Sequence, residues 1–163
     1  MIEVATSMHQ LAFGQLMEVY SQSNQESGSA LWPEEPAGVQ LANAEQEMYA
    51  YLREVFFPAG GRVWYLCRDS RYVSALRLES WRNGLLLTAL ETSPAHRGKG
   101  YAKELISGVQ AKLGAVKIYS HISKENAPSI AVHEACGFSK IYDYAVLLDS
   151  SVDRKFATYL YEK

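Results

Sequence analysis

The chain has 163 residues, and its 16 Lys and Arg residues against 18 Asp and Glu residues give a formal net charge of −2. This length suits a single domain over residues 1–163, and a hydrophobic fraction of 48% excludes a disordered chain. Nucleic-acid binders usually carry a basic excess, so the balanced charge argues against a nucleic-acid partner. The longest apolar runs are too short to cross a membrane.

The N-terminus and the two cysteines bear on localisation. The first residues include Glu3 and form no basic, apolar leader, so we expect no signal peptide. Cys67 and Cys136 are too few for a disulfide scaffold. We therefore expect two reduced thiols in a cytoplasmic protein.

Two helices with a loop between them are expected in the first third of the chain. Ser7 and Gln10 have the spacing of a capping box, which predicts a helix running to about Tyr20. Residues 21–40 are rich in Ser, Gln, Glu, Gly and Pro, and they predict a long surface loop with about one helical turn. Such a loop is either functional or a simple connector. Apolar residues at helical spacing predict the second helix over residues 43–57.

The middle of the chain predicts an antiparallel meander of three strands, over residues 62–68, 72–79 and 84–92. The first is rich in Val, Trp and Tyr, and the second alternates apolar and polar residues. Asn83-Gly84 is the strongest short signal for a hairpin between the second and the third.

The pattern then changes to a helical period. Apolar residues recur from Tyr101 to Leu113, and Gly114 is placed to end that helix. A following strand implies a right-handed crossover and a parallel pair. The other expected elements are strands over 2–5, 115–123, 138–148 and 156–161 and a helix over 126–136. The order β-α-α-β-β-β-α-β-α-β-β predicts an α/β fold (an α+β mixed sheet) of about seven strands with helices on both faces.

A candidate phosphate site lies where the strand ending at Thr92 leads into the next helix. The connecting residues 93–102, SPAHRGKGYA, hold two glycines that flank a lysine, with an arginine just before them. Backbone amides that open a helix have no partners within it, and the helix dipole favours an anion there. The alternative to a phosphate site is a tight turn whose lysine is simply exposed to solvent. Two familiar phosphate loops do not match, because Gly100 stands where the Walker form needs Ser or Thr, and Lys103 stands where the dinucleotide form needs Gly.

Residues 97–102 resemble the acetyl-coenzyme A loop of the GNAT superfamily of N-acetyltransferases. That loop has Arg or Gln, two further residues, Gly, one residue, and then Gly or Ala; the run RGKGYA matches it in full, and Pro94 also fits. The expected order of elements is similar to that fold over most of the chain. The resemblance implies an enzyme that moves an acetyl group directly from acetyl-CoA to a primary amine of a small molecule or peptide.

The resemblance also implies which residues hold acetyl-CoA. The loop amides would bind the pyrophosphate, and backbone groups near Leu90 and Thr92 would bond the pantetheine arm as an added strand does. The strands over 84–92 and 115–123 would part to admit it. The full set of implied cofactor residues is Leu90, Thr92, Arg97, Gly98, Lys99, Gly100, Tyr101, Ala102, Asn126 and Ser129, with no metal.

A second segment, from Asn126 to Phe138, resembles the family's other cofactor segment, in which Asn opens a helix and Gly-Phe closes it. Asn126, Ser129 and His133 share one helix face, where they could line a pocket. Alternatively, Asn126 only caps the helix and His133 only packs in the core. The Ser129 and His133 pair looks like the phosphinothricin acetyltransferase branch, but the C-terminal strands do not continue that likeness.

Candidate acids and bases follow from this alignment. Many family members carry a tyrosine, the usual general acid, where His133 stands, so His133 is a candidate for either proton-transfer role. Tyr142 and Tyr144 are further candidates for the acid, or else core aromatics. Glu91 is the best-placed carboxylate for a base, with a solvent-facing strand glutamate as the alternative and Glu79 as a weaker second.

The acceptor is open, because the sequence is compatible with small amines, amino acids, antibiotics and protein N-termini. The first two helices and their loop usually shape the acceptor side in this family, and here that region carries Glu26, Trp32, Glu34 and Glu35. Carboxylates near an aromatic ring suit a cationic amine, although loop carboxylates are often only solvated. The sequence does not fix the oligomeric state, and a homodimer is one of the states compatible with it. An acyl-CoA-binding module without transferase activity is the alternative function, because the family's tyrosine is missing.

Overall fold

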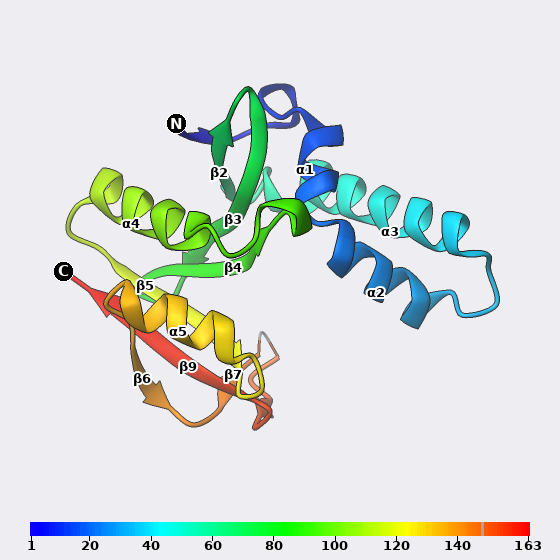
Figure 1. Ribbon diagram of the computed structural model, residues 1–163. Helices are drawn as coiled ribbons and strands as arrows, with labels where there is room; N and C mark the ends of the chain where they lie inside the picture. The colour runs from blue at the N-terminus through cyan, green and yellow to red at the C-terminus, as the bar shows by residue number, and fades with distance from the viewer. Residues whose placement is uncertain (148) are drawn as a thin grey trace.

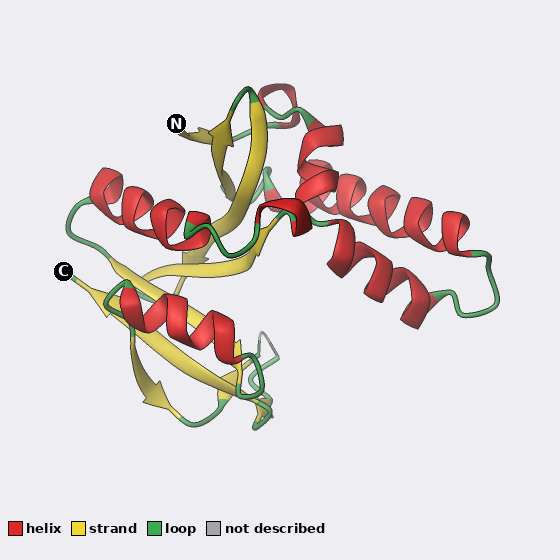
Figure 2. Ribbon diagram, viewed as in Figure 1, coloured by secondary structure: helices red, strands yellow, loops and turns green. Residues whose placement is uncertain are grey.

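The computed structural model describes residues 1–147 and 149–163. Its main feature is a seven-stranded mixed sheet in the order β1-β2-β3-β4-β5-β9-β6, with helices on both faces (Figures 1 and 2). This arrangement confirms the expected fold class. The strands of the sheet are β1 (Ile2–Ala5), β2 (Arg62–Arg68), β3 (Arg71–Trp81), β4 (Gly84–Thr92), β5 (Lys117–Ser123), β6 (Ser139–Tyr142) and β9 (Phe156–Glu162), while β7 (Ala145–Val146) and β8 (Val152–Asp153) form a separate ribbon.

Five α-helices surround the sheet in the part of the chain that the structure describes. They are α1 (Phe13–Val19), α2 (Ser21–Leu31), α3 (Ala37–Tyr51), α4 (Tyr101–Leu113) and α5 (Ala127–Ala135), and a π-helical turn (Leu52–Phe56) continues α3. Side chains alternate between the two faces of the strands, so Val63 and Tyr65 of β2 pack with α1 whereas Trp64 and Leu66 pack with α4. No helix among the described residues is both long and apolar enough to cross a membrane.

The meander was predicted correctly, and its turns follow simple backbone chemistry. Trp81 of β3 pairs with Gly84 of β4, so Arg82 and Asn83 form the two-residue turn. Arg82 takes a positive φ of 50°, which hairpin turns of this length commonly require. The helix predicted from Tyr101 is observed as α4.

The helix predicted over residues 7–20 is wrong in its first half. The Ser7 side chain makes no capping hydrogen bond. The Gln10 side chain instead accepts a hydrogen bond from the Thr6 amide at 2.7 Å, which closes a short 3₁₀ turn. Leu11 is extended, and the regular helix α1 begins only at Phe13.

The long loop predicted over residues 21–40 is also wrong, because α2 and the start of α3 occupy it. The helix α2 has no apolar stripe, and its buried residues are Asn24 and Gly28. A Cβ at Gly28 would lie 2.4 Å from the Gln40 carbonyl oxygen of α3, so glycine allows the two helices to touch. Contact with α3, rather than a local periodicity, therefore specifies α2.

The strand predicted over residues 138–148 is divided into β6 and β7. The register of β6 on β9 shifts between Lys140 and Tyr142, and the Tyr144 carbonyl then accepts a hydrogen bond from Thr158 Oγ1 at 2.7 Å. This bond holds the chain where it leaves the sheet for the ribbon with β8, a strand that the sequence did not predict. Residue 148 lies outside the described residues.

The parallel strands β4 and β5 part near their middle, as expected from the family resemblance. They pair only where residues 85–87 face residues 118–120. Beyond this point β4 has an irregularity, at which Ala89 adopts a positive φ of 50° and the pairing with β3 shifts. The second half of β4 therefore turns one of its backbone edges away from β5.

Candidate functional site

A cavity of about 920 Å³ opens where β4 leaves β5. Its walls come from the start of α2, one residue of α3, the neighbouring strands β3 and β4, the β4–α4 loop with the first turn of α4, and the first turns of α5. One half of the cavity is bordered by the start of α4 and by α5. The other half lies under α2 and α3, on the opposite face of the sheet.

The half near α4 is built to receive an anion. Gly98 and Gly100 have positive φ values of 75° and 78°, and Gly100 is the residue before the first turn of α4. These backbone conformations, which favour glycine, bring the free amides of the helix start to the cavity wall. Lys103 adds a positive charge to the same wall, a role that the sequence did not predict for it.

Nine of the ten implied cofactor residues line this cavity. The exception is Lys99, which does not line it. Asn126 lines the cavity and also caps α5, because its Oδ1 accepts a hydrogen bond from the Ser129 amide at 3.2 Å. The residues therefore fit a long diphosphate ligand such as acetyl-CoA, whose diphosphate would meet the start of α4. The residues brought together are Leu90, Thr92, Arg97, Gly98, Gly100, Tyr101, Ala102, Asn126 and Ser129.

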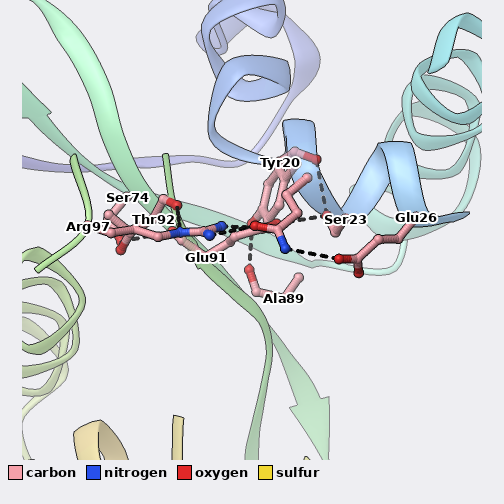
Figure 3. A network of polar contacts seen from close by, with 9 residues as sticks. Tyr20, Ser23, Glu26, Ser74, Ala89, Glu91, Thr92 and Arg97 are labelled. Carbon is pink, nitrogen blue, oxygen red and sulfur yellow. Dashed lines mark hydrogen bonds and ion pairs between the residues drawn. The ribbon is translucent and has the colours of Figure 1, made fainter. Parts of the chain in front are cut away.

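Arg97 extends from the loop before α4 toward α2 (Figure 3). Its Nε donates to the Thr92 carbonyl oxygen at 3.3 Å, and its Nη1 donates to Gln22 Oε1. The Nη2 atom of Arg97 lies 3.8 Å from Glu91 Oε1. This side chain therefore connects the loop before α4 with the helix that covers the other half of the cavity.

Glu91 lies on the cavity wall and faces α2 (Figure 3). Its side chain is 16% exposed, so it is not the solvent-facing glutamate of the alternative interpretation. Ser23 Oγ lies 2.7 Å from Glu91 Oε2. Burial raises the pKa of the Glu91 carboxyl, and the hydrogen bond from Ser23 and the charge of Arg97 oppose that shift.

Tyr20 fixes the irregular part of β4. Its hydroxyl donates to the Ala89 carbonyl oxygen at 2.7 Å, and burial raises the pKa of this phenol. The sequence did not identify Tyr20, Ser23 or Arg77 as site residues, although all three line the cavity. No local signal marks them, because the hydrogen bond from Ser23 to Glu91 joins residues 68 positions apart.

His133 does not line the cavity, and it is only 1% exposed. Its Nδ1 lies 2.7 Å from the Ser129 carbonyl oxygen and its Nε2 lies 3.1 Å from Ser120 Oγ. The network assigns the proton to Nδ1, because the carbonyl can only accept. Burial lowers the pKa of His133, which keeps the ring neutral. This geometry favours the packing interpretation.

Other candidates also lie away from the cavity. Tyr142 is 43% exposed on β6 and stacks on Tyr144. Glu79 lies beside a separate, smaller cavity of about 100 Å³. Among the four acceptor-side candidates, Glu26 lines the large cavity, whereas Trp32, Glu34 and Glu35 do not.

Comparison with known proteins agrees with this geometry. A search of curated proteins found no match, whereas many solved structures share the fold. The PaiA N-acetyltransferase of Thermoplasma acidophilum, solved with coenzyme A, is 15% identical, with a TM-score of 0.61 over 100% of this chain and 99% of that one. A mutant spermidine N-acetyltransferase of Vibrio cholerae is 18% identical, with a TM-score of 0.61 over 99% and 94% of the two chains.

The sequence itself carries the family pattern. The profile of the acetyltransferase (GNAT) family matches residues 16–138. This stretch holds the loop before α4, the strands on either side of the cavity and the helix α5. The chain therefore belongs to the acetyltransferase (GNAT) family, whose enzymes use acetyl-CoA.

Proposed function

We propose that this protein is a cytoplasmic N-acetyltransferase that moves an acetyl group from acetyl-CoA directly to a primary amine of a small molecule or peptide. One observation carries the proposal: a continuous cavity joins an anion-binding helix start to the half-buried carboxylate of Glu91. The two cysteines are unpaired, which suits a reducing compartment.

The residues near α4 hold the cofactor in this proposal. The amides from Gly98 to Ala102 bind the diphosphate, and backbone groups of Leu90 and Thr92 bond the amide-bearing arm. The arm occupies the edge of β4 that β5 leaves free beyond residue 87. Asn126 contributes from the start of α5, where it lines the same cavity.

Glu91 is the general base of the proposal. Acetyl-CoA supplies the acetyl group as a thioester. An alkyl amine is mostly protonated at neutral pH, so it must lose a proton before it can attack a carbonyl carbon. Glu91 accepts that proton, directly or through one water, and its raised pKa makes it a stronger base than an exposed glutamate.

The chain needs no strong acid beside the departing sulfur, because an ordinary thiol has a pKa of about 8.5. His133 and Tyr142, which lie outside the cavity, therefore have no proton-transfer role in this proposal. The presence of His133 in place of the tyrosine that many family members carry is then compatible with turnover.

The test is release of free coenzyme A thiol when the protein is mixed with acetyl-CoA and a broad panel of amines. We expect release that depends on the amine. Binding of coenzyme A, measured by calorimetry, without thiol release from any amine would instead support the binding module. Absence of binding would overturn both functions.

A further inference from the structure

Arg77 is a cation in the half of the cavity under α2 and α3, and no described carboxylate is paired with it. It lies on β3, opposite Thr88 of β4, and lines the cavity under α2 and α3. The centre of its guanidinium lies 5.4 Å from the ring centroid of Tyr51 and 5.7 Å from that of Phe56. Its Nε is buried and has no hydrogen-bond acceptor, and no carboxylate within the described residues forms an ion pair with Arg77.

This environment leaves the hydrogen-bonding edges of the guanidinium available. The aromatic rings stabilise its charge and restrict its plane, but they do not provide a lone pair for its N–H groups. Protein atoms enclose Nε, so a ligand oxygen would have to bind the Nη groups, for which no hydrogen bond to a described residue is present. A planar guanidinium can bind a carboxylate through two parallel hydrogen bonds, and a carboxylate is the oxyanion that an amine acceptor such as an amino acid carries.

The same half of the cavity also carries negative charge, at a separate position. Glu91 lines the same cavity as Arg77, but its polar partners are Ser23 and Arg97. Glu26 adds a second carboxylate from α2. The wall thus presents a cation and a carboxylate to one small ligand.

We infer that the acceptor is an amine that also carries a carboxylate, such as an amino acid. Arg77 binds the carboxylate, while Glu91 faces the amine that is acetylated. This inference rests on the proposed function and narrows its acceptor. Arg77 is thereby a specificity-determining residue and takes no part in proton transfer.

The experiment compares matched acceptors. Each amino acid of a panel is tested beside its decarboxylated amine, with thiol release from acetyl-CoA as the measurement. We expect kcat/KM to favour the carboxylated member by roughly 10- to 100-fold. Turnover of the amines without this preference would overturn the inference and leave the proposed function standing.

Two variants separate recognition from packing. Arg77→Met keeps the unbranched stem and should abolish the preference by raising KM for the carboxylated member only. Arg77→Lys keeps the charge without the planar fork and should retain part of the preference. Arg82→Met is the matched control, because Arg82 also lies over an aromatic ring, that of Trp81, but does not line the cavity.

A binding measurement keeps the inference testable if no amine is acetylated. N-acetylated amino acids and N-acetylated decarboxylated amines are titrated by calorimetry into the protein saturated with coenzyme A. We expect tighter binding of the carboxylated compounds, and this difference should vanish in Arg77→Met. Equal binding of the two classes would overturn the carboxylate site even in a protein without turnover.

Discussion

Glu91 combines two opposing influences on one carboxyl group. Burial favours its protonated form, whereas the hydroxyl of Ser23 and the charge of Arg97 favour its ionised form. A general base needs both properties, because it must be ionised at the working pH and still bind a proton well. Single residues around Glu91 therefore allow the sharpest tests of the proposed chemistry.

Glu91→Gln removes the proton acceptor and preserves the shape of the side chain. The amide oxygen can still accept the hydrogen bond from Ser23, so the fold should survive. We expect kcat to fall by roughly 10²- to 10⁴-fold, with coenzyme A affinity unchanged. Steady-state kinetics and calorimetry check the two parts, and an unchanged kcat would show that another group is the base.

Ser23→Ala should move the acidic limb of the pH–rate profile. The lost hydrogen bond had stabilised the ionised carboxylate, so the pKa of Glu91 rises further and activity is lost at a higher pH as the solution is acidified. The rate well above this pKa should change little. Ser27→Ala, one turn further along α2, is the control and should leave the limb in place.

Gly100→Ala tests the anion site at the start of α4. A Cβ would meet no atom within 4 Å, but φ is 78°, so the cost is backbone strain of about 1–2 kcal/mol. Relief of this strain would redirect the amides, and we expect weaker binding of coenzyme A by calorimetry. Gly60→Ala has an equally open site and a φ of 88°, but lies outside the large cavity. It should lose similar stability in urea without affecting binding.

At the scale of elements, the contact between α2 and α3 forms the cover of the half of the cavity that lies under these helices. Gly28→Ala would place a methyl group 2.4 Å from the Gln40 carbonyl oxygen, and a helix backbone cannot yield easily. We expect the two helices to separate, with a loss of about 1–3 kcal/mol in stability and a higher KM for the amine. The affinity for coenzyme A should remain, because its residues lie elsewhere.

Gly38→Ala is the matched control on α3. No atom lies within 4 Å of the added methyl group, so its effect on stability should reflect helix propensity alone, a gain of up to about 1 kcal/mol. Urea unfolding and saturation kinetics on both variants measure these effects. Equal KM values for the amine would show that the helix contact does not shape the acceptor site.

The elements that sequence could predict are those whose signal is local. The helix α4 follows an apolar period, and Leu105, Ile106 and Val109 are all buried as that period requires. The loop before it carries its own glycines. By contrast, α2 buries Asn24 and Gly28, which form no periodic pattern.

The residues of the candidate site also differ in whether a local sequence signal marks them. The half of the cavity near α4 is built largely from a continuous motif, so the sequence could name most of the residues that line it, although Lys99 does not line it. The other half depends on Tyr20, Ser23 and Arg77, which come to line the same cavity as Glu91 only after the elements that carry them have packed together. His133 was misleading for the opposite reason, because its position in the motif does not reveal the hydrogen bond to Ser120 that draws it into the core.

For the molecule as a whole, a cofactor held between β4 and β5 should stabilise the fold. Binding at one hundred times the dissociation constant adds about 2.7 kcal/mol, which for a chain of this size raises Tm by roughly 5 to 10 °C. Differential scanning calorimetry with acetyl-CoA, ATP or NAD measures this effect. A larger shift with ATP or NAD would contradict the assignment of the loop at the start of α4.

The early end of the β4–β5 ladder at residue 87 leaves part of β4 without a strand partner on that side. The remaining part of β4 then presents main-chain donors and acceptors as the border strand of an incomplete sheet does. A strand from another molecule has the same amide chemistry as the cofactor arm and can compete for that border. We therefore expect saturating acetyl-CoA to slow aggregation of the protein, in addition to sustaining turnover.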